Sequence, residues 1–406
     1  MLTRREFGKF ALAGVPAATV LGTSPLLRAL AQTKPNSLIE GVQIGTITYS
    51  YRSMPDQSAE ATLRYIVESG ISAVELMGGP VNDYARKRTN FQPSTGGRAG
   101  GGGGAGRAGG GGGGGRGRGE VDPATLTASW NGTPCRPAPE GDAPRGGGAG
   151  AAPPAGAPAA GAPGAPPAGG GGGRGRGDQT PEQQAAAAAA AEEERKWRMS
   201  LPMSIFKDLR KMYNDAGVSI YAVKDVRQGT DEDLEYTFAV AEALGANHVT
   251  LELPSGPNAA ATLKRLGDWG LKKKIYAAYH THTQGSMTCF DEAFAISKGN
   301  MANVDLGHWV AAGNVGGTPM QFLEKYHDRV SSFHLKDRTL PKNCALNLAW
   351  GTGETPIKEI LQLVKKNKWK IPASIELEYN VPEGSDAVKE TRKCVEFCRA
   401  ALTAKA

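Results

Sequence analysis

The sequence is poor in several features that mark whole classes of protein. Only five of its 406 residues are cysteine, and no two of them form a Cys-x-x-Cys pair, so neither a disulfide scaffold nor a thiolate metal site is expected. Beyond the first thirty residues no apolar run is long enough to cross a membrane. No Gly-x-Gly-x-x-Gly follows the first expected strand, which argues against a dinucleotide-binding domain.

A basic surface for nucleic acid is also lacking, although the net charge is +7. The leader contributes +3 and residues 91–178 contribute another +3, which leaves about +1 for the rest of the chain. The Arg-Gly pairs in 91–178 lack the interleaved aromatic residues that stack on bases. No nucleic-acid partner is therefore expected.

Glycine and proline are in excess, and the excess is local. Residues 91–178 hold 33 of the 56 glycines and 12 of the 26 prolines. Such a segment cannot bury enough apolar surface to offset its ordering entropy. We expect 91–178 to be a long disordered Gly/Ala/Pro/Arg-rich insert with a less biased island at 120–142. A helix from Pro181 to Met199, capped by Thr180, should follow it.

The first 31 residues have the pattern of an export signal. Paired arginines at positions 4 and 5 precede Phe7, a mildly apolar region runs from Phe10 to Leu27, and Ala29-Leu30-Ala31 is a small-x-small cleavage site. The pattern resembles a twin-arginine signal. It predicts a periplasmic or otherwise exported protein with no stable membrane anchor after cleavage. An uncleaved anchor is the alternative.

The remaining residues, 40–90 and 179–406, alternate β-rich apolar runs with amphipathic helical stretches. Strands are expected at 42–48, 73–76, 218–223, 248–253, 274–279, 302–306, 330–335 and 373–377. Helices are expected at 58–68, 205–215, 231–244, 259–271, 286–297, 319–326, 356–367 and 386–402. Eight such units over about 280 residues match an α/β fold of the (β/α)8 TIM barrel type, with the insert after the second strand. A doubly wound open sheet is the competing fold.

In a barrel of this type the chemistry lies where the strands end. The last five expected strands end in polar motifs: Leu251-Glu252, His280-Thr281-His282, Asp305-Leu306-Gly307-His308, His334-Leu335-Lys336-Asp337 and Ile375-Glu376-Leu377-Glu378. Four of the six histidines fall at these ends, whereas His248 and His327 look structural. Imidazole and carboxylate together suit one divalent metal ion, such as Mn²⁺, Zn²⁺, Co²⁺ or Mg²⁺. Each residue alone could be a satisfied core group, but the joint pattern is hard to attribute to packing.

These motifs, together with Ala73-Val74-Glu75-Leu76 at the second strand, resemble the xylose isomerase-like barrels of the sugar phosphate isomerase/epimerase superfamily. The resemblance covers about 40–90 and 196–403. It implies that Asp305, His334 and Glu376 bind the metal. The family's fourth ligand is usually a glutamate at the fifth strand, where this sequence has His280, with Glu252 as another candidate.

Members of that family move protons next to a carbonyl through a metal-stabilised enediolate. The candidate bases are Glu252, His280 and Glu376, and Lys336 is a candidate donor to the developing oxyanion or a partner of Asp337. The candidate substrate contacts are Glu75, His282, His308, Trp309 and Trp350. The alternative role of the two tryptophans is packing in the core, and that of Glu75 is pairing with a basic group.

Three functions remain open at this point. The first is an isomerase or epimerase of a free sugar, since phosphorylated sugars are scarce outside the cytoplasm. The second is a lyase that eliminates the aglycone from a 3-keto-glycoside, and the third is a non-catalytic carbohydrate-binding barrel. A related abasic-site endonuclease would need more histidines and access to DNA. The expected partner is thus a small-molecule sugar or keto-glycoside, and the sequence leaves a homo-oligomer open.

Overall fold

The computed structural model describes residues 34–93, 125–139 and 180–404. By its internal contacts the chain divides into residues 1–34 and residues 35–406, and every element below belongs to the second unit. The expected signal at 1–31 and most of the expected insert at 91–178 lie outside the described residues. Within the described part of the chain, no helix is long and apolar enough to span a membrane.

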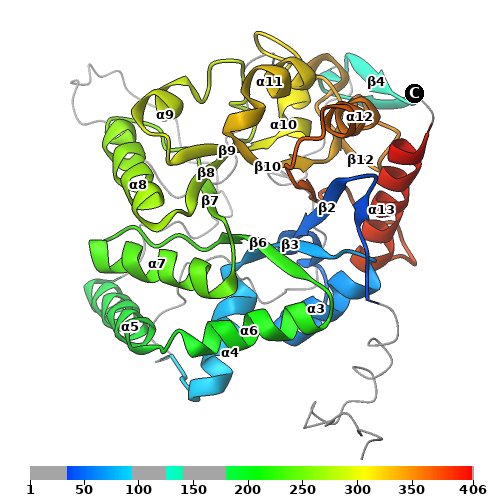
Figure 1. Ribbon diagram of the computed structural model, residues 1–406. Coiled ribbons are helices and arrows are strands. Elements are labelled where there is room, and N and C mark those ends of the chain that lie inside the picture. Colours follow the sequence, from blue (N-terminus) through cyan, green and yellow to red (C-terminus); the bar gives the residue numbers. More distant parts are fainter. Residues whose placement is uncertain (1–33, 94–124, 140–179, 405–406) are drawn as a thin grey trace, which may run out of the picture. The chain divides into compact units, whose positions relative to one another are not determined.

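Eight parallel strands form a closed ring at the centre of this unit (Figure 1). In chain order they are β2 (Val42–Ile47), β3 (Ala73–Met77), β6 (Ser219–Lys224), β7 (His248–Glu252), β8 (Tyr276–His280), β9 (Asn300–Asp305), β10 (Val330–Leu335) and β13 (Ala373–Ile375). Pairing of β2 with β3 closes the ring, and the short β1 (Leu38–Ile39) runs antiparallel to β2. The predicted TIM barrel is confirmed, and the open sheet is excluded because the ring has no free edge.

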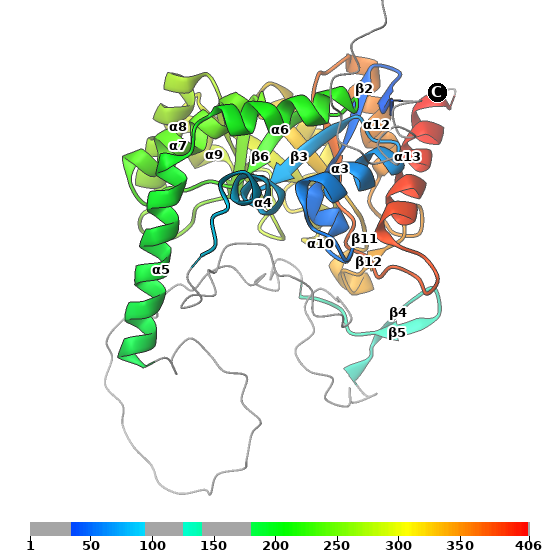
Figure 2. The ribbon, with the colours of Figure 1, turned by 90° about the horizontal axis from the view of Figure 1, so that it is seen from below.

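Helices cover the outside of the barrel (Figures 1 and 2). They are α3 (Ala59–Glu68), α4 (Gly78–Thr89), α6 (Ser204–Asp215), α7 (Asp231–Leu244), α8 (Ala259–Lys273), α9 (Asp291–Ile296), α10 (Leu306–Ala311), α11 (Pro319–Tyr326), α12 (Ile357–Asn367) and α13 (Ala387–Thr403). A further helix, α5 (Pro181–Ser200), extends away from the barrel, and its buried residues lie between Ala190 and Arg198 (Figure 2). Single 3-10 turns occur at η1 (Thr48–Tyr51), η3 (His327–Arg329) and η4 (Pro341–Asn343). Thr180, Thr230 and Thr318 each form a capping box with the third residue of the helix that follows, as expected of threonine at these positions.

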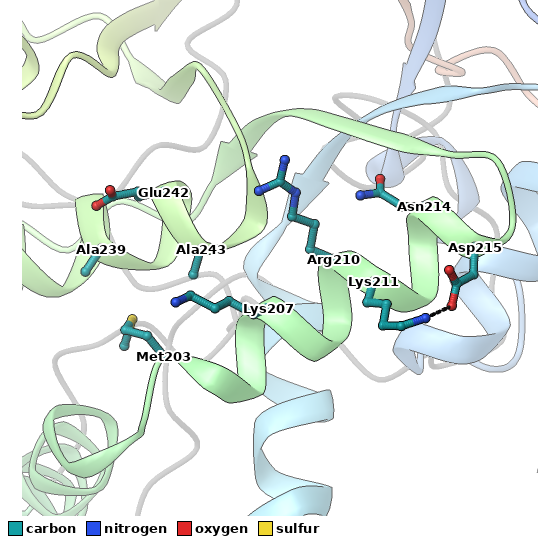
Figure 3. Close-up of a pocket in the computed structure, with 9 residues that line it drawn as sticks. All are labelled: Met203, Lys207, Arg210, Lys211, Asn214, Asp215, Ala239, Glu242 and Ala243. Carbon is teal, nitrogen blue, oxygen red and sulfur yellow. Dashed lines mark hydrogen bonds and ion pairs between the residues drawn. The ribbon is translucent and has the colours of Figure 1, made fainter. Parts of the chain in front are cut away.

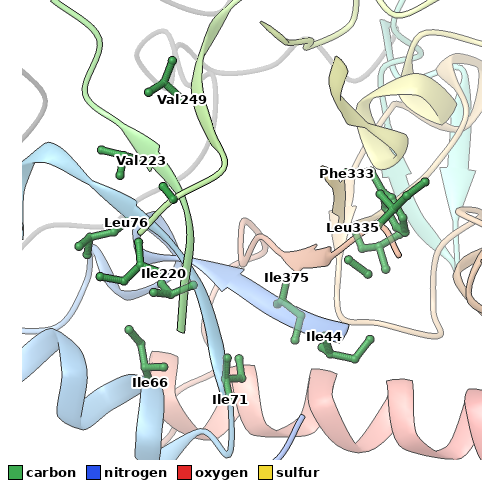
Figure 4. Close-up of a cluster of buried hydrophobic side chains, with 14 of the residues drawn as sticks. Ile44, Ile66, Ile71, Leu76, Ile220, Val223, Val249, Phe333, Leu335 and Ile375 are labelled. Atoms are coloured by element: carbon green, nitrogen blue, oxygen red, sulfur yellow. The ribbon is translucent and has the colours of Figure 1, made fainter. Parts of the chain in front are cut away.

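The strands bury their apolar and their polar side chains in two different regions. Their apolar side chains, such as Ile44 and Phe333, belong to the main hydrophobic core (Figure 4). Polar side chains of the same strands meet inside the ring, where Asn303 of β9 reaches Glu75 of β3. Because successive side chains of a strand alternate in direction, Val304 joins the core while Asn303 and Asp305 are buried among polar groups.

Residues 125–139 differ from the expected disorder. They contain a hairpin of β4 (Ala128–Trp130) and β5 (Thr133–Cys135). A disulfide joins Cys135 to Cys344, 209 residues further along the chain. Trp130 Nε1 donates a hydrogen bond to the carbonyl oxygen of Thr352, 3.1 Å away. No disulfide was predicted from the cysteine spacing, but this one forms and fixes the hairpin to the loops after β10.

Candidate metal centre

Four of the predicted site residues converge at the carboxyl ends of four strands that are consecutive in the ring. They are His280 of β8, Asp305 of β9, His334 of β10 and Glu376, which follows β13. One ligand atom from each can be chosen so that all four lie within 4.8 Å of one another, and all four side chains are buried. Parallel pairing explains the convergence, because His334 is in register with Asp305 on the neighbouring strand.

The His334 imidazole lies between two carboxylates. Its Nδ1 is 2.8 Å from Glu376 Oε2, and its Nε2 is 2.8 Å from Glu75 Oε2. Burial opposes a charged imidazole, but Glu75 and Glu376 outweigh it and raise the pKa of His334 to about 10. Glu75 itself is fully buried and also accepts a hydrogen bond from Thr250 Oγ1. The structure therefore places Glu75 beneath the cluster, against His334, and not at a surface that a sugar could reach.

The His280 imidazole is hydrogen-bonded to the side-chain amide of Asn303. Its Nδ1 is 3.0 Å from Asn303 Oδ1, and its Nε2 is 4.0 Å from Asp305 Oδ2. Burial and the charge of Lys224 lower the pKa of His280 well below its usual range, so the imidazole is neutral. A neutral imidazole can bind a metal ion.

Lys336 brings a positive charge to the same cluster. Its Nζ is 2.9 Å from Asp305 Oδ2, 2.9 Å from Glu376 Oε2 and 2.8 Å from Glu378 Oε2. Burial works against its charge, but these carboxylates raise the pKa of Lys336 above its usual value. Burial likewise opposes ionisation of Glu376, yet Lys336 and His334 hold its pKa well below the usual range. Burial raises the pKa of Asp305.

The alternative partner considered for Lys336, Asp337, has a different role. Asp337 Oδ2 accepts hydrogen bonds from the backbone N–H groups of Gly351, Thr352 and Gly353, and Oδ1 accepts one from Thr355. Its carboxylate thus fixes the conformation of the loop at 351–355. The ion pair between Lys336 and Asp337 is not formed.

A rim of partly exposed polar groups lies above the buried cluster. The His282 ring is 5.1 Å from the His280 ring and 4.9 Å from the His308 ring, centre to centre. His308 Nε2 is 3.7 Å from Glu378 Oε2, and its Nδ1 accepts a hydrogen bond from Arg338. Burial and the nearby cations Lys336 and Arg338 hold the pKa of His308 well below its usual range. His282 and His308 therefore lie where a substrate could contact them.

Three other predicted site residues lie apart from the cluster. The Glu252 side chain is 54% exposed, and its carboxylate pairs with Lys224 and His282. Its prediction as a metal ligand is not supported, because it is not among the four converging residues. Trp309 is fully buried, packs on Phe322 and donates a hydrogen bond to the Gly317 carbonyl, so it is a core residue. The Trp350 ring packs edge to face on Phe397.

The donor set suits a divalent metal ion. Asp305 Oδ2 is buried and accepts no hydrogen bond, although Lys336 Nζ is close to it. Two imidazoles and two carboxylates are the ligand types that Mn²⁺, Zn²⁺ and Co²⁺ share, and Mg²⁺ prefers the carboxylates among them. The residues present therefore fit the predicted ion, with His280, Asp305, His334 and Glu376 as the holders.

A large surface hollow of about 840 Å³ lies elsewhere, between α6 and α7 (Figure 3). Its lining includes Lys207, Arg210 and Glu242, and it contains none of the predicted site residues. Since barrel chemistry lies at the strand ends and this hollow lies between two outer helices, it is not a candidate active site.

Comparisons with known proteins find similar solved structures. Neither a protein-family model nor a curated protein matches the chain. A sugar phosphate isomerase/epimerase from Parabacteroides distasonis is similar in structure, with 14% identity, a TM-score of 0.46, and 90% of this chain and 96% of that chain covered. A xylose isomerase domain protein from Planctomyces limnophilus has 14% identity and a TM-score of 0.40 over 50% of this chain and 84% of that chain.

A third similar structure is the 3-keto-D-glucoside 4-epimerase YcjR from E. coli. It has 11% identity and a TM-score of 0.38, with 49% of this chain and 85% of that chain covered. The barrel that the motif resemblance implied is present in this chain by its own strand order. The function of this chain has to be argued from its own residues.

Sequence reasoning missed several groups of the site. Asn303, Thr250 and Ser332 are buried in the polar interior of the barrel, and Arg338 contacts His308. Asn303 carries a detectable signal, because it is two residues before Asp305 and so points to the same side of β9. Glu378 stands in a quoted motif, but nothing in its spacing indicates the contact with Lys336.

Proposed function

We propose that the protein is a divalent-metal-dependent enzyme of the sugar isomerase/epimerase type, which removes a proton next to a carbonyl. The observation that carries this proposal is the convergence of His280, Asp305, His334 and Glu376 to within 4.8 Å, buried below a polar rim. Packing alone does not account for four polar side chains from consecutive strands around one point, because Asp305 Oδ2 among them is buried without a hydrogen bond, which is costly.

A bound divalent ion would supply Lewis-acid polarisation of a sugar carbonyl and adjacent hydroxyl. Glu376 is ionised at neutral pH, because Lys336 and His334 hold its pKa low, so it can accept the proton from carbon. Lys336 keeps its proton and can donate a hydrogen bond to the oxygen on which negative charge develops. His282 and His308 at the rim would bind the sugar hydroxyls.

The number of candidate bases at the site distinguishes between isomerisation and epimerisation. Epimerisation by two bases needs a proton acceptor and a proton donor on opposite faces of one carbon. Of the two candidate carboxylate bases, Glu376 belongs to the cluster, whereas Glu252 pairs with Lys224 outside it. Aldose–ketose isomerisation needs a single base that moves a proton between neighbouring carbons. The site thus favours isomerisation over two-base epimerisation.

The same single base favours a second candidate, the elimination of an aglycone from a 3-keto-glycoside. Glu376 would remove the proton from C2, a C1–C2 double bond would form, and the C1–O bond to the aglycone would break. The departing oxygen would take a proton from Lys336, which is within ion-pair distance of Glu376. The non-catalytic barrel remains the third candidate, and it requires neither the metal nor Lys336.

We also propose that the protein is exported. The twin-arginine pattern of residues 1–31 is the basis of this proposal. The disulfide between Cys135 and Cys344 supports it, because disulfides persist in oxidising compartments. The substrate would then be a free sugar or a keto-glycoside met outside the cytoplasm, where a sugar phosphate is scarce.

The test compares three forms of the mature protein, residues 32–406. They are the wild type, the double variant D305A/H334A, and a matched control, H327A/D328A, which changes the same residue types in η3. Elemental mass spectrometry after dialysis against Mn²⁺, Zn²⁺ and Co²⁺ should find about one ion per chain in the wild type and the control and none in the site variant. A wild type that retains no ion would leave only the binding barrel.

Incubation of the loaded protein in D₂O then identifies the reaction. Deuterium at the carbon next to the carbonyl, with sugar mass otherwise unchanged, supports the isomerase. Release of the aglycone from a synthetic 3-keto-glycoside supports the lyase. Loading with metal and neither product would contradict both proposed reactions.

A further inference from the structure

We propose that one buried polar layer under the metal site fixes which ring nitrogen each histidine ligand presents to the ion: Nε2 for His280 and Nδ1 for His334, with Asn303 and Glu75 as the positioning residues. The inference rests on the metal site of the proposed function. It concerns the orientation of the ligands, and not the identity of the substrate.

The orientation of the Asn303 amide follows from its neighbours. Its Nδ2 is 3.3 Å from Glu75 Oε2 and 2.6 Å from Ser332 Oγ. A carboxylate only accepts hydrogen bonds, so the amide must turn its N–H groups toward Glu75. The opposite atom, Oδ1, then faces His280 Nδ1 at 3.0 Å.

That orientation decides the tautomer of His280. An amide oxygen cannot donate, so the proton of this hydrogen bond is on His280 Nδ1. The lone pair of the neutral ring is therefore on Nε2. This nitrogen faces the cluster, 4.0 Å from Asp305 Oδ2. The amide of Asn303 thus makes Nε2 the atom that can bind a metal ion.

Glu75 orients the His334 ring, with the two nitrogens reversed relative to His280. Its Oε2 accepts the hydrogen bond from His334 Nε2, 2.8 Å away, so this nitrogen carries a proton. Nδ1 faces the cluster, 2.8 Å from Glu376 Oε2. Glu75 is fixed in turn by Thr250 Oγ1, which donates to its other oxygen at 2.6 Å. Carboxylates that hold the far nitrogen of a histidine ligand in this way orient the ring and raise its basicity.

The layer is anchored away from the metal site by His248. Ser332 Oγ accepts from Asn303 and lies 2.8 Å from His248 Nε2, while His248 Nδ1 contacts Asn247 Oδ1. Because Asn247 Oδ1 can only accept, His248 carries its proton on Nδ1 and accepts from Ser332. A continuous series of hydrogen bonds thus leads from Asn247 through His248, Ser332, Asn303 and Glu75 to the two histidine ligands, and each bond has a defined direction. Reversing one ring would break several of these bonds.

Long-range ¹H–¹⁵N spectra of the histidine-labelled mature protein test this directly. Without metal, neutral His280 should show the Nδ1-protonated tautomer, a result that does not depend on metal binding. With Zn²⁺, the metal-induced shift should fall on Nε2 of His280 and on Nδ1 of His334. An Nε2-protonated His280, or ligation of both rings through Nε2, would overturn the proposal. Failure to bind Zn²⁺ with the expected tautomer present would count against the proposed function alone.

Two variants give the quantitative test. In N303A, metal-free His280 should shift toward the Nε2-protonated tautomer, and Zn²⁺ affinity, measured by competition with a chromophoric chelator, should fall about 10- to 100-fold. In E75Q, affinity should fall by a similar factor while His280 keeps its tautomer. Ser69→Ala is the matched control, because Ser69 is fully buried and hydrogen-bonded to Tyr51 and Tyr65 on the outer side of the barrel. Unchanged affinity in both N303A and E75Q would refute the positioning role.

Discussion

Lys336 Nζ lies 2.9 Å from Asp305 Oδ2, without forming a hydrogen bond of good geometry. The Lys336 ammonium is thus within ion-pair distance of the Asp305 carboxylate, which is also a predicted metal ligand. The same ammonium is 2.9 Å from a second predicted ligand, Glu376. Lys336 therefore balances the negative charge of the cluster, and it would compete electrostatically with a bound divalent ion for the same two carboxylates.

Lys336→Met should separate metal binding from catalysis. Without the competing charge, the variant should bind Mn²⁺ or Zn²⁺ about tenfold more tightly. Turnover should nevertheless fall at least 100-fold, because the donor to the developing oxyanion is lost. Chelator competition and steady-state kinetics measure the two effects. Lys393→Met is the control, since Lys393 is exposed and pairs with Glu390 on α13. Weaker metal binding in Lys336→Met would contradict the competition.

The disulfide predicts how many free thiols the protein has before and after reduction. Cys289, Cys394 and Cys398 are free, so the unreduced protein, denatured and titrated with a thiol reagent, should show three thiols, and the reduced protein five. Cys135→Ser should lower the free energy of unfolding by about 2–4 kcal/mol, because the bond closes a loop of more than 200 residues. Limited proteolysis should then cut within 125–139 faster than in the wild type. Five thiols without reduction would show that the bond does not form.

Much of the barrel was predictable because its signals are local. The helix Asp231–Leu244 and the strand Val330–Leu335 have the bounds that capping residues and apolar runs predicted. α4 was missed, since its first turn, Gly78-Gly79-Pro80, has the composition of a loop. The pairing of Cys135 with Cys344 joins residues 209 positions apart, and no local pattern encodes such a partner.

The candidate site was predictable to the extent that strand ends encode it. Barrel geometry brings residues at the ends of neighbouring strands together, so Asp305, His334 and Glu376 could be grouped from the sequence and the family resemblance. Whether His280 or Glu252 joins them could not be settled, because both stand at strand ends. Only the structure shows that Glu252 pairs with Lys224.

Asp337 should matter for the shape of the loop that follows β12 (Asn347–Leu348). Four backbone N–H groups of residues 351–355 donate to its carboxylate. Asp337→Ala would leave them without an acceptor, and we expect the free energy of unfolding to fall by about 3 kcal/mol. Hydrogen exchange at 351–355 should speed up. Asp215→Ala, which removes an exposed partner of Lys211, should change stability by less than about 0.5 kcal/mol. Unaltered exchange in Asp337→Ala would contradict this role.

His248 should make the protein less stable in mild acid. Burial lowers its pKa from the ordinary 6.5 to about 4, against the opposing charge of Glu75. Between these values the unfolded chain binds a proton that the folded His248 does not, so the free energy of unfolding falls as the pH falls. The gap corresponds to at most about 3 kcal/mol, lost between about pH 6.5 and pH 4.

Urea unfolding at pH 7.5, 6.5, 5.5 and 4.5 measures this loss. His248→Gln keeps polar atoms that can meet Ser332 and Asn247 but cannot be protonated, so its stability should fall about 2–3 kcal/mol less than that of the wild type over the same range. Ser69→Ala should be destabilised while keeping the pH dependence of the wild type, because Ser69 contacts Tyr51 and Tyr65 and not His248. Parallel curves for the wild type and His248→Gln would mean that other groups carry the acid sensitivity and that His248 already accepts its proton in the folded barrel.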